Sequence, residues 1–89
     1  MGELNRAVAV AMADGPAAGL ELVEALEASG AWPGYHLVPA TRADLLRRLG
    51  RPAEAAASYR QALELAGSDA ERRYLSQRLA ASVRDAQPS

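Results

Sequence analysis

The chain has 89 residues, no cysteine and a formal net charge of −1. Its length suits one small domain, and the absence of cysteine excludes disulfides and thiolate metal sites. The nearly balanced charge excludes a general attraction to nucleic acid or membranes. No apolar run is long enough to span a membrane and the N-terminus lacks a secretory signal, so we expect a cytoplasmic protein.

A first helical hairpin is predicted at the N-terminal end. Its first helix covers residues 4–13 and stops at Asp14-Gly15, a strong breaker pair. Its second helix begins with Pro16, whose missing N–H costs nothing at that position. Gly30 suits the residue that follows the end of this helix.

A second helical hairpin is predicted after a loop at residues 31–34. Its first helix begins between His36 and Pro39, because proline is tolerated only in the first turn of a helix, and it runs to Leu49. The second helix of this hairpin covers residues 52–67, again with a proline at its start.

A fifth helix, at about residues 69–86, is predicted to cap the C-terminal end. Ser68 and Glu71 form the Ser-x-x-Glu pattern of a capping box. One buried stripe is expected from three apolar residues at four-residue spacing: Leu75, Leu79 and Val83. The rest of the helix is polar, with Arg72, Arg73, Gln77, Arg78 and Arg84.

Small residues recur at the same spacing in the two hairpins. Ala7 and Gly19 are twelve residues apart, and so are Ala43 and Ala55. The distance between packed helices depends on the side chains at the contact. We therefore expect each pair to face each other across its hairpin. A core without Phe and with one Trp has to use Ala, Leu and Val, which also favours closely packed helices.

This spacing resembles the tetratricopeptide repeat, a helix–turn–helix unit of 34 residues. The positions that match best are Ala43, Leu46, Ala55, Tyr59 and Ala62. The resemblance implies one domain over residues 1–89, with hairpins at about residues 4–30 and 36–67 and a capping helix at about 69–86. The expected fold is all-α, a right-handed α-solenoid fragment of five helices.

The first helix is apolar on every side over residues 7–12. Such a helix should be covered all round, and its neighbours in the hairpins can cover only part of it. We expect either that the chain is part of a longer protein or that this helix lies in a homodimer interface. The candidate docking surface comprises Leu4, Val10 and Met12.

The arginine-rich third helix allows two interpretations. Positive charge gathers at Arg42, Arg47, Arg48 and Arg51, as in a patch for nucleic acid or an acidic partner. The alternative is a solvated face on which Asp44 pairs with Arg47 or Arg48. We favour the second, because no aromatic residues are interleaved to stack on bases. We predict no direct contact with nucleic acid.

The sequence offers little chemistry for catalysis. Trp32, Tyr35 and His36 could form a ligand-facing cluster, but packing of the loop is the favoured interpretation. His36 is the one histidine of the chain, whereas metal and acid–base sites need several converging groups. We therefore predict no enzyme, no metal and no cofactor.

Two pairs of strings go beyond a generic repeat. They are LNRAVAVA followed by DGPAAGL at residues 4–20, and YHL followed by RADLLRRLGR at residues 35–51. These strings resemble the C-terminal extension of a group of bacterial sigma factors of the extracytoplasmic-function type. The resemblance covers nearly the whole chain.

The resemblance implies that sigma regions precede this segment in a longer protein and are missing here. It further implies a tetratricopeptide-like module that regulates transcription through contacts with its own sigma regions or with core RNA polymerase.

An alternative function is an independent module that binds a peptide of an outside partner. In tetratricopeptide arrays peptides lie along the first helix of each hairpin. That pattern implies a groove lined by Asn5, Val8, Asp44, Arg47 and Arg48. A third hypothesis is an enzyme or small-molecule sensor built around the cluster of Trp32, Tyr35 and His36.

Overall fold

The computed structural model describes residues 2–30 and 34–87, and this part of the chain contains helices and turns but no strand. Its helices are α1 (Gly2–Asp14), α2 (Pro16–Ala28), α3 (Leu37–Arg48), α4 (Pro52–Leu65) and α5 (Asp69–Ala86). The predicted all-α class is confirmed. The handedness of a solenoid stays a prediction.

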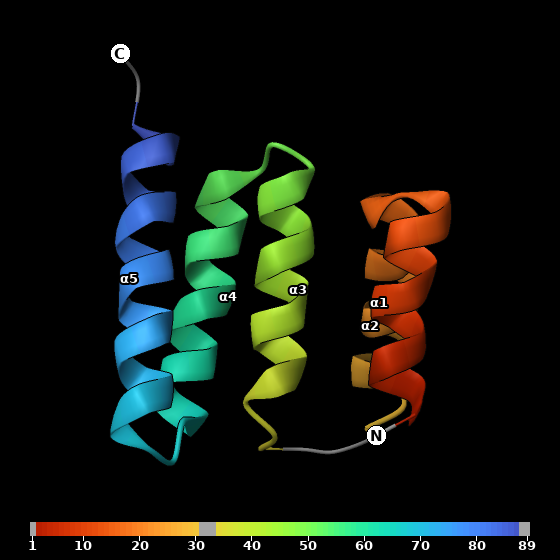
Figure 1. The fold of residues 1–89 in the computed structure, drawn as a ribbon, viewed down its shortest axis with the longest axis horizontal. Helices are drawn as coiled ribbons and strands as arrows, with labels where there is room; N and C mark the ends of the chain where they lie inside the picture. The colour runs from red at the N-terminus through yellow and green to blue at the C-terminus, as the bar shows by residue number, and fades with distance from the viewer. Residues whose placement is uncertain (1, 31–33, 88–89) are drawn as a thin grey trace.

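Each helix packs against the next one along the chain. Figure 1 shows α3, α4 and α5 side by side, with α4 between its neighbours, and the α1–α2 hairpin at the other end. Helix α1 has little contact with α3, whereas α2 packs on α3 more extensively. The first hairpin therefore joins the rest of the molecule mainly through α2.

Glycine and proline set the helix ends at the predicted places. Gly15 and Gly50 have φ angles of 100° and 74°, in the left-handed region that a residue without Cβ adopts at little cost. Pro16 and Pro52 then begin α2 and α4. The breaks between the helices of each hairpin thus follow from local sequence.

The turn between α4 and α5 differs slightly from the prediction. Helix α4 ends at Leu65, two residues early. The Ser68 hydroxyl accepts a hydrogen bond from the backbone N–H of Glu71 at 3.1 Å, as a capping box requires. The Glu71 carboxylate, however, accepts from the N–H of Gly67 at 3.2 Å, one residue before the usual partner.

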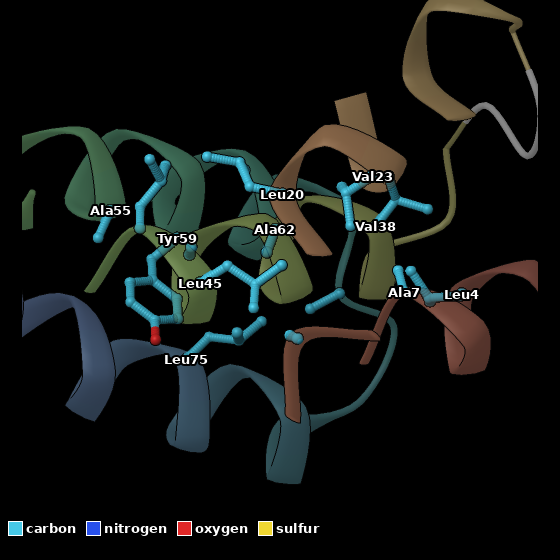
Figure 2. Packing of buried hydrophobic residues seen from close by; sticks show 14 residues of the cluster. Leu4, Ala7, Leu20, Val23, Val38, Leu45, Ala55, Tyr59, Ala62 and Leu75 are labelled. Carbon is cyan, nitrogen blue, oxygen red and sulfur yellow. The ribbon is translucent and has the colours of Figure 1, made fainter. Parts of the chain in front are cut away.

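The core continues from the first hairpin to α5 and consists mainly of alanine, leucine and valine. Its largest buried side chain is Tyr59, whose ring reaches from α4 toward α5 beside Leu75 (Figure 2). The predicted stripe on α5 is only partly correct. Leu75 is buried, but Leu79 and Val83 are half-buried, and Ser82 on the same face is fully buried instead.

The two helices of the first hairpin approach each other most closely at Gly19. A Cβ added to this residue would lie 2.6 Å from the Cβ of Ala11 and 2.8 Å from the carbonyl oxygen of Ala7. Both distances are shorter than a van der Waals contact. The predicted small-residue contact in this hairpin is therefore present. In the second hairpin, Ala43 and Ala55 are both fully buried.

We predict that Gly19→Ala destabilises the domain. Alanine normally favours a helix over glycine by about 1 kcal/mol, but here the added methyl has to displace the backbone of α1, at a cost of about 1–3 kcal/mol. Urea unfolding followed by circular dichroism measures the change. The control is Gly67→Ala, because a Cβ at Gly67 meets nothing within 4 Å. Equal stability of the two variants would contradict the close contact.

Candidate protein-docking surfaces

The side of α1 that faces away from the protein exposes apolar side chains. Met12 is 78% exposed and Val8 is 40% exposed, and Val10 is half-buried. Leu4, by contrast, is only 6% exposed, so its assignment to the docking surface was wrong. Leu4 lies three residues before Ala7, on the side of α1 that packs into the core. Val8 and Met12 lie one turn apart on the same side of α1, whereas Val10, two residues from each, lies on the opposite flank and was wrongly grouped with Met12. We call Val8 and Met12 the α1 face.

A shallow cavity of about 300 Å³ lies on the first hairpin. Its lining residues are Arg6 of α1 and Leu22, Ala25, Leu26 and Ser29 of α2. Leu22 and Leu26 are half-buried and pack against the edge of the core. The first hairpin therefore presents apolar side chains from both of its helices.

Ion pairs within α3 account for much of its positive charge. The Asp44 carboxylate lies 2.8 Å from Nη2 of Arg47 and 3.2 Å from Nη2 of Arg48. The hydrogen bond to Asp44 raises the pKa of Arg47. The predicted pairing of Asp44 with its neighbours is confirmed for both arginines.

The structure does not test the predicted groove as a whole. Asn5 and Val8 are exposed on α1, and α1 has little contact with α3, which carries Asp44, Arg47 and Arg48. The structure brings the α3 residues together but does not join them to the α1 residues through a packed interface. The α1–α3 groove stays a prediction.

Arg51, at the start of α4, is also paired. Its Nη2 donates a hydrogen bond to Oε1 of Glu54 at 2.8 Å. This hydrogen bond lowers the pKa of Glu54 and raises that of Arg51. Both side chains are about half exposed, so we expect the pair to contribute little to stability.

Arg42 forms the most extended polar junction that the structure describes. Its Nη1 lies 3.2 Å from Oε2 of Glu27 on α2, and its Nη2 donates a hydrogen bond to Oε1 of Gln61 on α4. One side chain of α3 thus ties both neighbouring helices together. The sequence did not reveal this role, because the three residues are far apart along the chain.

His36 connects the starts of α3 and α5. Its Nε2 lies 3.2 Å from Oε2 of Glu71, and its ring meets the Tyr35 ring edge-on, with centroids 5.6 Å apart. These contacts support the interpretation of His36 as a packing residue. Trp32, the third residue of the predicted cluster, lies outside the described residues.

A cavity of about 310 Å³ between α3 and α5 was not predicted. His36, Leu37 and Ala40 line it from α3 and the turn before it, and Ala70, Glu71, Tyr74 and Leu75 line it from α5. Tyr74 is 53% exposed. A tyrosine on the otherwise charged surface of α5 was the one signal in the sequence that could have indicated this site.

Neither metal-ligand clusters nor membrane-spanning helices are found in the described part of the chain. No group of three or more His, Cys, Asp or Glu side chains could hold a metal ion there. No helix there is both long and apolar enough to cross a bilayer.

The chain is similar to a protein of Rhizobium meliloti (strain 1021). No family model and no solved structure matches the chain. The chain is 40% identical over 76 residues to an uncharacterized protein of Rhizobium meliloti (strain 1021). The match covers 85% of this chain but only 18% of the Rhizobium protein. The chain thus spans less than a fifth of the length of that relative.

We predict that Arg42→Met loosens the connection between the hairpins. Methionine keeps the apolar stem but leaves the partly buried Glu27 carboxylate without its cation, which should cost about 1–2 kcal/mol of unfolding free energy. Urea unfolding gives the energy, and hydrogen exchange should show faster opening of α2. The control is Arg48→Met, which removes a more exposed ion pair within one helix and should cost less than about 0.5 kcal/mol. Equal costs for both variants would rule out a special role for Arg42.

Proposed function

We propose that this chain is the regulatory protein-interaction domain of a bacterial RNA polymerase sigma factor of the extracytoplasmic-function type. It acts in the cytoplasm by contacting its sigma regions or the polymerase, and it does not read DNA itself. The strings at residues 4–20 and 35–51 support this family. The observation that carries the docking role is the α1 face.

The exposure of the α1 face gives docking a physical basis. Removing apolar surface from water contributes about 25 cal/mol per Å², and large apolar side chains clustered on one surface often mark an interaction site. Met12 adapts easily to a partner, because its side chain is unbranched and flexible. A separate cavity at Leu22 and Leu26, whose lining includes Arg6 but neither Val8 nor Met12, adds apolar surface elsewhere on the first hairpin.

The Rhizobium relative supports a domain within a longer protein. The segment matched by this chain makes up 18% of that relative, so most of the relative lies outside it. In the proposed arrangement, this remaining part includes the sigma regions, and one of them covers the α1 face.

A second candidate function is an independent module that binds a peptide of an outside partner. The cavity between α3 and α5 favours it, because this cavity is separate from α1 and is lined almost entirely by apolar atoms. A homodimer through α1 is a third way to cover the α1 face.

We predict that the tagged chain co-purifies with core RNA polymerase or with the part of the Rhizobium relative outside the matched segment. Val8→Glu and Met12→Glu should each weaken this association at least about tenfold, because they place a charge in an apolar contact. Surface plasmon resonance measures the affinity. The control is Leu65→Glu on α4, because Leu65 is 41% exposed and therefore matches Val8.

Two results would overturn the sigma proposal. One is no association with either partner, together with unchanged transcription in vitro when the matched segment is removed from the Rhizobium relative. The other is a self-associating chain whose molar mass by ultracentrifugation halves with Met12→Glu, since a homodimer would then cover α1.

A further inference from the structure

The cavity between α3 and α5 has the size and chemistry of a side-chain pocket. Its volume of about 310 Å³ is at the lower limit of the range of about 300–1,000 Å³ found for small-molecule sites. Leu37 and Tyr74 stand at its edge and are 37% and 53% exposed. The pocket therefore accepts one large apolar side chain from the solvent side.

A guanidinium group lies next to this pocket. Nε of Arg78 donates a hydrogen bond to the Tyr74 hydroxyl at 3.3 Å, and the guanidinium carbon lies 5.4 Å from the centre of the Tyr74 ring. Among the described residues, no carboxylate lies within ion-pair distance of Arg78. The apolar pocket is thus bordered by Arg78, whose positive charge has no carboxylate partner among the described residues.

A second group of positive charges faces Arg78 from α3. Arg47 and Arg48 share the single carboxylate of Asp44, which leaves one of their two charges uncompensated. Both Arg47 and Arg78 lie near the Tyr59 hydroxyl of α4 and act on it electrostatically. The space above Tyr59 is therefore flanked by cations from two helices.

The buried Tyr59 hydroxyl lies close to these cations. Burial raises the pKa of Tyr59, and the neighbouring Arg47 side chain lowers it by less. Tyr59 thus belongs to the floor below the arginines. Guanidinium groups suit a carboxylate, because each presents several N–H donors.

The distance between the pocket and the cations follows from helix geometry. Helices α3 and α5 lie on either side of α4 and run in the same direction (Figure 1), and the contact between His36 and Glu71 joins their N-terminal ends. Ala40, in the pocket, and Arg47 are seven residues apart on α3, which is roughly 10 Å along the axis. An extended peptide covers that distance in about three residues.

We propose that the groove between α3 and α5 binds an extended segment of a partner protein that carries a large apolar residue and, three residues away, an acidic one. The apolar side chain enters the pocket beside Tyr74, and the carboxylate lies between Arg78 and Arg47. This occupant fits better than nucleic acid, because the groove combines one apolar pocket with only two excess charges. The inference rests on the proposed function only in that the chain acts through protein contacts.

The test uses capped ten-residue peptides and the full 89-residue chain. Two peptides carry leucine and glutamate three positions apart, in either order, and a third carries lysine in place of glutamate. Titration by NMR should shift the amide signals of Ala40, Ala70 and Leu75 with at least one acidic peptide. The lysine peptide should bind at least about tenfold more weakly, and added salt should lower the affinity of the chain for the acidic peptide.

Two variants locate the binding site. Ala70→Trp fills the pocket from an exposed position on α5, and Arg78→Glu reverses the flanking charge. Each substitution should lower the affinity for the acidic peptide about tenfold or more. Arg60→Glu, at an exposed arginine of α4, should leave that affinity unchanged. Circular dichroism verifies that each variant is folded. If a variant does not fold, the NMR signal shifts in the unaltered chain still show where the peptide binds.

Three outcomes would overturn this inference: no binding of either acidic peptide, equal binding of the lysine peptide, or signal shifts confined to α1 and α2. The readout is independent of polymerase. Peptide binding without sigma association would overturn the proposed function but keep this groove, and sigma association without peptide binding would do the reverse.

Discussion

The close contact between helices through alanine and glycine is the constraint on which this fold depends. A chain with no Phe and one Trp cannot fill wide spaces between helices with aromatic side chains. Its helices therefore have to approach until backbone meets backbone, as at Gly19 and Ala7. The short turns at Gly15 and Gly50, which follow from local sequence, let the two helices of each hairpin return side by side.

Contacts between the hairpins combine the continuous apolar core with polar interactions. Where the hairpins meet, Arg42 reaches carboxylate and amide groups on two other helices. At the opposite edge of the second hairpin, His36 reaches Glu71, which also accepts a hydrogen bond from the turn before α5. Apolar burial thus extends along the described part of the molecule, and these polar contacts add specific links between neighbouring helices.

Local features could be predicted from the sequence, and features that depend on distant residues could not. Proline, glycine and Ser68 gave the helix ends, because each acts within a few residues of its own position. The pairing of Asp44 with Arg47 and Arg48 is also local. Leu4, however, was assigned to the wrong side of α1, and Ser82 was not expected inside. Helix α1 has apolar residues on several sides, so its sequence does not specify which side packs into the core. Helix α5 is polar apart from one stripe, and a serine gives no signal that its position is buried.

The two candidate surfaces belong to different parts of the molecule, and this separation has a functional consequence. The α1 face belongs to the first hairpin, whereas the groove is built by α3, α4 and α5. A partner that covers Val8 and Met12 leaves Tyr74 and Arg78 open, because α1 has little contact with α3 and the pocket is lined from α3 and α5 alone. Under the two proposals above, the α1 face and the groove are therefore separate sites, so that occupation of one does not by itself fill the other.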